Sequence, residues 1–140
     1  MAPSGDRFFH EISGFRMKGL RVAVILLVVL EAGWITFDGA QALRTGAYLK
    51  PRLGAYGGRV GEWTRVASVL GAPAGSTRAK WALIGYGVAW LCAAFAFARG
   101  AGWAWWALFI FAGGALWYSS LGVPICLAQM LLLIAARRDT

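Results

Sequence analysis

The chain has few of the side chains on which soluble and catalytic proteins depend. Only 14% of its 140 residues are charged, against about a quarter in an average soluble domain. Hydrophobic residues make up 59% of the sequence. The sole histidine, His10, has no second histidine or cysteine at ligand spacing, which argues against a metal site. The composition therefore excludes an ordinary soluble domain, and we expect no cofactor.

Motifs for catalysis and for nucleic-acid binding are missing as well. Ser119 and Ser120 have no base in a local motif, so nothing indicates a hydrolase. The glycine-rich run 54–61 lacks a preceding strand and the spacing of a phosphate-binding loop. The net charge is +8, but the basic residues lie between apolar runs instead of on one face. We therefore expect a non-catalytic protein without a nucleic-acid partner.

Long apolar runs are abundant, and they make the lipid bilayer the expected solvent. We expect an all-α integral membrane bundle over residues 20–136, with an N-cap at Ser76 or Thr77. Its four predicted transmembrane helices cover residues 20–43, 78–98, 103–120 and 121–136. The last is short for a crossing, so a re-entrant hairpin of the third and fourth runs is the alternative. A cleaved signal peptide is the alternative for the first run, but its acids and the distant cleavage motif favour retention.

Two segments lie outside these runs. Residues 1–19 are amphipathic, and we expect them to lie at the membrane surface. The first connection, 45–77, is long and glycine-rich. Within it, apolar residues at helical spacing predict an interfacial helix over 60–70, a plain loop being the alternative.

The outstanding polar feature is a row of residues inside the first predicted helix. Glu31 lies near its middle and Asp38 two turns further on. Helical spacing predicts one face shared by Glu31, Trp34, Asp38 and Gln41. An unpaired carboxylate at mid-bilayer costs roughly 2.5 to 3.5 kcal/mol, so this face should point into protein or a wet cavity. Glu31 is then either a proton or cation site, or a packing group that hydrogen-bonds to Gln129.

Small residues and thiols give further expectations about packing. Gly85, Ala89 and Ala93 repeat every four residues and predict a seam for helix packing within the bundle. Cys92 and Cys126 fall in opposite halves of the predicted bilayer, so we expect free thiols. Asp38 lies near enough to the interface to pair with an arginine such as Arg44 or one in the loop.

The surplus of Trp and Phe on only four helices predicts contacts outside the bundle, at positions such as Trp105 and Phe109. We expect an accessory, assembly or structural subunit of a larger membrane complex. The alternative is a small oligomeric proton- or cation-coupled transporter that uses Glu31. The expected partners are the lipid bilayer and either other subunits or further copies of the chain. The basic flank before the first helix favours cytoplasmic termini in a bacterial cytoplasmic membrane, although Lys and Arg are shared equally between the two sides.

Overall fold

The chain is helical throughout the part that its structure describes. The computed structural model describes residues 4–48, 65, 68–73, 75–116, 118 and 122–138. Within these residues there is no strand, and the helices are α1 (Ser4–Thr45), α3 (Thr77–Ala98), α4 (Gly102–Ala115) and α5 (Val123–Arg138). The all-α prediction is therefore confirmed for these residues. Of the predicted interfacial helix over 60–70, only residues 65 and 68–70 are described, and residues 65, 68 and 69 are helical. The rest of it, with most of the connection 45–77, lies outside the described residues.

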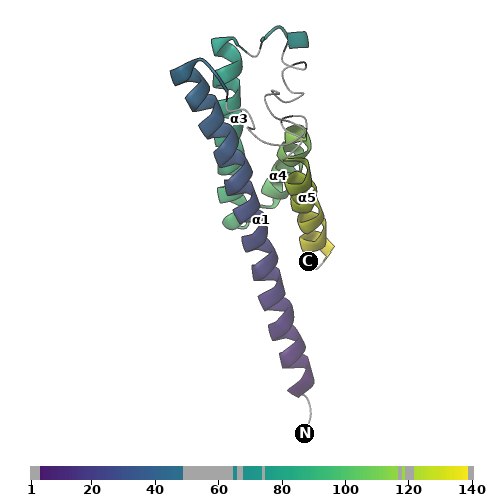
Figure 1. Ribbon diagram of the computed structural model, residues 1–140. Helices are drawn as coiled ribbons and strands as arrows, with labels where there is room; N and C mark the ends of the chain where they lie inside the picture. Colours follow the sequence, from purple (N-terminus) through teal and green to yellow (C-terminus); the bar gives the residue numbers. More distant parts are fainter. Residues whose placement is uncertain are drawn as a thin grey trace.

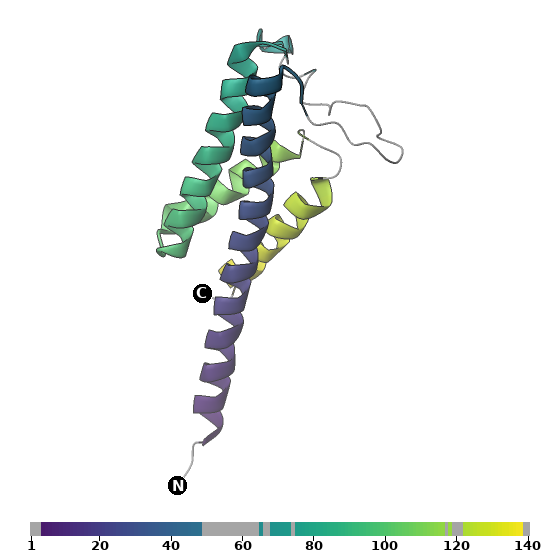
Figure 2. The same ribbon diagram turned by 60° about the vertical axis from the view of Figure 1, so that its left-hand side comes forward.

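The helices form a long pair and a shorter hairpin beside it (Figure 1). α1 packs against α3 and α5, and α4 packs against α3 and α5. The C-terminus lies at the end of the bundle from which the N-terminal part of α1 projects, and this part of α1 extends beyond every other helix (Figures 1 and 2). The hairpin of α4 and α5 does not reach the level at which α1 ends and α3 begins (Figure 2).

Local sequence explains where α3 begins and ends. Ser76 is its N-cap, and the Ser76 hydroxyl accepts a hydrogen bond from the backbone N–H of Ala79 at 3.2 Å, as predicted. After the helix, Gly100 adopts a φ of +84°, which glycine tolerates without strain. The backbone N–H of Ala101 then bonds to the carbonyl of Ala96 at 3.0 Å. This tight turn sends the chain directly back into α4.

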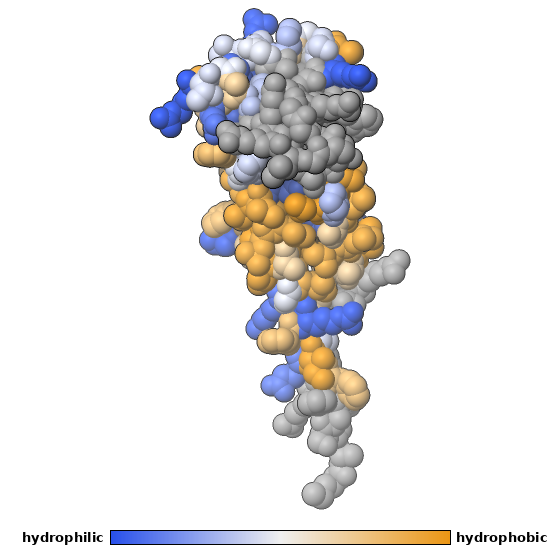
Figure 3. Space-filling view, in the orientation of Figure 1, coloured by the Kyte–Doolittle hydropathy of each residue, from blue (hydrophilic) through white to orange (hydrophobic). Residues whose placement is uncertain are grey.

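Two helices are long and apolar enough to cross a membrane within the described residues: Glu11–Thr45 of α1, and α3. The helices α4 and α5 have 14 and 16 residues, or about 21 and 24 Å at the usual helical rise. A bilayer core is about 30 Å thick. The four helices are therefore present, but only two of them have the length of a crossing. Figure 3 shows a broad apolar band with hydrophilic residues beyond it at both ends.

The helix α1 combines two segments that we predict separately from the sequence, the surface segment 1–19 and the crossing helix 20–43. The helix is continuous for 42 residues, or about 63 Å. It therefore contains both the segment predicted to lie at the membrane surface and the first predicted crossing.

The helices α1 and α3 approach each other closely at Gly87. A Cβ atom there would lie 2.1 Å from Thr36 Oγ1 and 2.7 Å from the carbonyl oxygen of Ala32. Gly85 and Ala89, from the predicted seam, instead face outward, and only Ala93 is buried. Two residues correspond to about 200° of rotation on a helix. Gly85 and Gly87 therefore lie on opposite faces, and within the described bundle Gly87 makes the close approach.

Candidate functional site: buried carboxyl groups on α1

Glu31 and Asp38 are both buried, with 7% and 3% of their surfaces exposed. They share a face of α1 with the buried apolar residues Val24, Val28, Ile35 and Ala42. The alternating spacing of three and four residues directs this face toward the neighbouring helices. Trp34, which the sequence places on the same face, is 54% exposed. It lies one residue, or about 100° of rotation, from the buried Ile35. Gln41 is half-buried at the edge of this face.

The hydrogen-bond partner of Glu31 is a thiol from α5. Cys126 Sγ donates to Glu31 Oε2 at 3.4 Å, and Cys126 is fully buried. Gln129, one turn further along α5, instead donates its Nε2 to the carbonyl of Leu108 on α4 at 3.3 Å. Its Oε1 finds no partner among the described residues. The structure therefore brings Cys126, and not Gln129, to Glu31.

Asp38 is held by a phenol from the segment between α4 and α5. The Tyr118 hydroxyl donates to Asp38 Oδ2. Beyond the end of α1, burial and then the charge on Asp38 raise the pKa of the Tyr48 phenol. The sequence suggests Arg44 or a loop arginine as the partner of Asp38. Arg44 is exposed, and the loop residues Arg52 and Arg59 lie outside the described residues. Asp38 therefore joins α1 to the segment between α4 and α5.

Side-chain hydrogen bonds also join α4 to α5, and α3 to α4. Trp105 Nε1 donates to the carbonyl of Leu133 at 2.8 Å, and the Trp105 ring stacks on Phe109 with centroids 5.3 Å apart. The Tyr86 hydroxyl of α3 donates to the carbonyl of Phe111 at 2.5 Å. The expectation that Trp105 and Phe109 are outward-facing is therefore wrong, because both pack against the core.

The two acids can fasten helices together, but they do not form a reactive cluster. Each receives a hydrogen bond from an element distant in sequence: Glu31 from α5, and Asp38 from the residues that follow α4. No group of three or more His, Cys, Asp or Glu side chains lies together in the described part of the chain. The geometry is therefore that of two buried links between helices.

Sequence reasoning missed several residues that complete this arrangement. Cys126 was considered only as a free thiol, although it lies one turn from Gln129 on the same side of α5. Nothing in the sequence pairs Tyr118 with Asp38, because the two residues lie 80 positions apart. Lys80, which is 9% exposed, carries no sequence signal at all. The backbone oxygen of Lys80 lies 3.2 Å from the position of a Cβ on Gly39, so it is at the level of Asp38.

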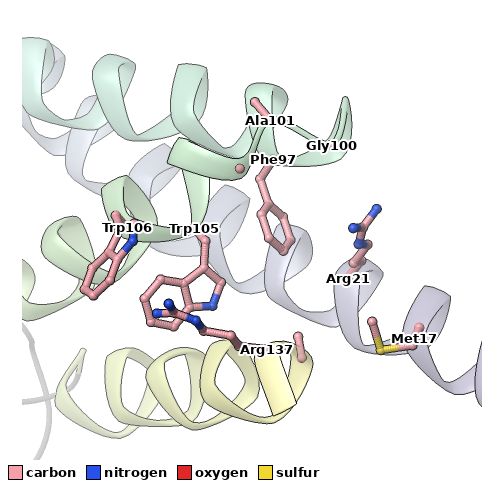
Figure 4. Close-up of a pocket in the computed structure, with 10 residues that line it drawn as sticks. Met17, Arg21, Phe97, Gly100, Ala101, Trp105, Trp106 and Arg137 are labelled. Atoms are coloured by element: carbon pink, nitrogen blue, oxygen red, sulfur yellow. The ribbon is translucent and has the colours of Figure 1, made fainter. Parts of the chain in front are cut away.

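A cavity of about 230 Å³ lies between α1, the turn that joins α3 to α4, and the end of α5 (Figure 4). Arg21 and Arg137 line it together with aromatic side chains. Arg137 Cζ lies 4.7 Å from the ring centroid of Trp105 and 5.0 Å from that of Trp106. Nothing in the sequence predicted this juxtaposition.

Comparison with known proteins adds no family to these observations. The chain matches no protein-family model, no curated protein and no solved structure. Its function must therefore be inferred from its own residues and their arrangement.

Proposed function

We propose that the chain is an integral membrane protein that serves as a non-catalytic accessory subunit of a larger membrane complex. The observation that carries this proposal is the projection of α1 beyond the bundle, with exposed apolar side chains on the projecting part.

The membrane arrangement favoured by helix length has two crossings and a hairpin. α1 and α3 cross the bilayer, while α4 and α5 enter it from the side of the termini and return. Hydrogen bonds from Trp105 and Gln129 to carbonyls of the facing helix support a self-contained hairpin. Large apolar side chains are exposed on all four helices, including Leu26, Trp34, Trp81, Phe95 and Ile110. Exposure of so large an apolar surface to water is unfavourable, and lipid tails would cover it.

The hydrogen bonds that Glu31 and Asp38 accept within the bundle support a non-catalytic role. Among the described residues, Glu31 and Asp38 are the two buried carboxyl groups, and each accepts a hydrogen bond from the chain itself. Buried polar groups that are satisfied in this way hold helices in register. The cavity near Arg21 has neither acid among its lining residues.

The N-terminal part of α1 supplies the argument for a partner. Residues 4–16 cover about 20 Å of helix, and the described side chains from Phe9 to Arg16 are all exposed. Ile12 is 49% exposed and Phe15 is 82% exposed. This segment continues the axis of a crossing helix (Figures 1 and 2), so it leaves the bilayer and lipid tails do not cover it. An amphipathic helix of this kind docks in an apolar groove of another protein.

Co-purification in a mild detergent tests the accessory function. The variant Ile12→Ser/Phe15→Ser removes the apolar side chains, and Glu11→Gln/Lys18→Gln is the control on the same segment with an unchanged net charge. We expect a defined set of proteins to co-elute with the wild type and the control, and to be lost from the first variant. A chain that elutes alone, or equal recovery of partners with both variants, would refute the proposal. Two differently tagged copies that co-purify without other proteins would assign this surface to a homo-oligomer.

Cysteine labelling tests the hairpin. In a Cys92→Ser background, Val123→Cys marks the start of α5, and Thr45→Cys marks the end of α1 as a control. An impermeant maleimide should label Thr45→Cys from the side opposite the termini and leave Val123→Cys unlabelled from that side. Labelling of both positions from that side would establish four crossings.

Proton- or cation-coupled transport through Glu31 is the second candidate. The observation in its favour is that the donor to Glu31 is a thiol, which is a weak hydrogen-bond donor. A carboxyl group held so weakly exchanges partners more readily than one held by several strong donors. Replacement of Glu31 by glutamine separates the two functions, as developed in the Discussion.

A further inference from the structure

The cavity at the end of the bundle near the C-terminus is lined by two basic side chains from distant parts of the chain. Arg21 belongs to α1 and Arg137 to α5, on different sides of the cavity, and residues of the turn between α3 and α4 line it as well (Figure 4). None of the described residues that line it is acidic. Its volume of about 230 Å³ is below the roughly 300 to 1,000 Å³ of sites for drug-sized ligands. The cavity therefore suits a small anionic group.

Aromatic rings position both guanidinium groups. Arg21 Cζ lies 5.8 Å from the ring centroid of Phe97, and Arg137 lies over Trp105 and Trp106. Stacking on an aromatic ring uses the face of a guanidinium group. The N–H donors of a guanidinium group lie in its plane and not on the stacked face. A planar fork of donors matches the oxygens of a phosphate.

The beginning of α4 adds to the positive potential at this cavity. Ala101 and Gly102 line it, and Ala101 is the N-cap of α4 without a side-chain hydrogen bond to the helix. The N-terminus of a helix carries a partial positive charge and presents backbone N–H groups. It supplements the two arginines, which are the main source of charge.

The position of the cavity indicates where its ligand comes from. It lies where α3 ends at Ala98 and where α5 ends at Arg138. Trp103 and Trp106, near the start of α4, are 63% and 54% exposed. Exposed tryptophan and basic side chains at the ends of apolar helices are typical of the headgroup layer of a bilayer. In the membrane arrangement proposed above, the cavity is therefore open to lipid headgroups.

We propose that this cavity is a binding site for the phosphate group of an anionic phospholipid. The inference rests on the membrane placement of the proposed function, but not on a partner subunit. Arg21 and Arg137 supply the positive charge that attracts the phosphate, and their guanidinium groups contact Phe97, Trp105 and Trp106. Basic pockets between helices at the membrane surface bind acidic headgroups by this chemistry.

Native mass spectrometry of the full chain in a neutral detergent tests the site. The chain is titrated with phosphatidylglycerol or with phosphatidylcholine, and bound lipid is counted directly. The test variant is Arg21→Gln/Arg137→Gln. The matched control, Arg16→Gln/Arg99→Gln, removes the same charge at the same end of the molecule from residues that do not line the cavity.

We expect the wild type and the control to retain phosphatidylglycerol in preference to phosphatidylcholine. Each basic residue near a bilayer surface strengthens anionic lipid binding about fivefold, so the double test variant should bind phosphatidylglycerol about 25-fold more weakly. Arg21→Gln alone should weaken it about fivefold, and it leaves the contacts of Arg137 with α4 intact. Circular dichroism of each variant establishes that it is folded.

Three results would overturn the inference. Equal losses in the test variant and the control would show diffuse attraction to the basic surface. Equal binding of both lipids by the wild type would show that charge on the headgroup is not recognised. Displacement of phosphatidylglycerol by millimolar inorganic phosphate or glycerol 3-phosphate would assign the cavity to a soluble phosphate. Because the assay uses the isolated chain, its outcome is separate from that of the partner experiment.

Discussion

The contact between α1 and α3 at Gly87 gives the sharpest test of the fold. In Gly87→Ala, the new methyl group would lie 2.1 Å from Thr36 Oγ1 and 2.7 Å from the carbonyl oxygen of Ala32. The threonine side chain can rotate, although its hydroxyl donates to that same carbonyl at 2.7 Å. The carbonyl belongs to the backbone of α1 and cannot move alone. The two helices must therefore separate.

The size of this separation sets the expected loss of stability. Ordinary van der Waals contact begins at 3.4 Å, so the backbone of α1 must retreat by about 0.7 Å near Ala32. A gap of about 0.5 to 1 Å loses a quarter to a half of each contact energy along the interface. Overpacking of this kind typically costs about 1 to 3 kcal/mol. Alanine also favours the helix by about 0.5 to 1 kcal/mol over glycine, which offsets part of the cost.

Gly85→Ala is the matched control because it makes the same chemical change two residues away. A Cβ at Gly85 has nothing within 4 Å among the described residues, so only the gain in helix propensity remains. We expect Gly87→Ala to lower the free energy of unfolding, and Gly85→Ala to leave it unchanged or raise it. Unfolding in mixed detergent micelles, followed by circular dichroism, measures both. Equal stability of the two variants would refute the placement of Gly87 at the helix contact.

Three further predictions concern the buried polar groups. Glu31→Gln keeps the length of the side chain and an acceptor for the Cys126 thiol, so stability should change by less than about 1 kcal/mol; loss of proton-dependent flux in reconstituted vesicles would instead favour transport. Tyr118→Phe removes the donor to Asp38 and should cost about 1 to 3 kcal/mol in detergent unfolding, whereas an unchanged midpoint would show that this hydrogen bond is dispensable. A membrane-permeable maleimide should modify exposed Cys92 in the folded chain and reach buried Cys126 only after unfolding; mass spectrometry that finds equal rates would contradict the packing of α5.

The sequence by itself determined the helical class and several helix ends. Long apolar runs require a backbone that satisfies its own hydrogen bonds, and the helix does so within one segment. Ser76 could be identified as a cap because its hydroxyl acts on a neighbouring N–H, without any distant residue. The turn at Gly100 is local for the same reason, because it depends on the backbone freedom of one residue.

Tertiary structure decided which face of each helix points inward. A helix of a soluble protein has a polar face toward water, and the opposite, apolar face is the buried one. The helices α3 and α4 are apolar on nearly all sides, so their sequences do not show which face is buried. The choice of Gly87 over Gly85, and the inward position of Trp105, therefore follow from how neighbouring helices pack. The pairing of Glu31 with Cys126 instead of Gln129 depends on the rotation of α5, because one turn of helix carries both candidates. Arg21 and Arg137 line one cavity although they come from different helices. Spacing along the chain determines which residues share a face of one helix, whereas contacts between helices depend on how the helices pack against one another.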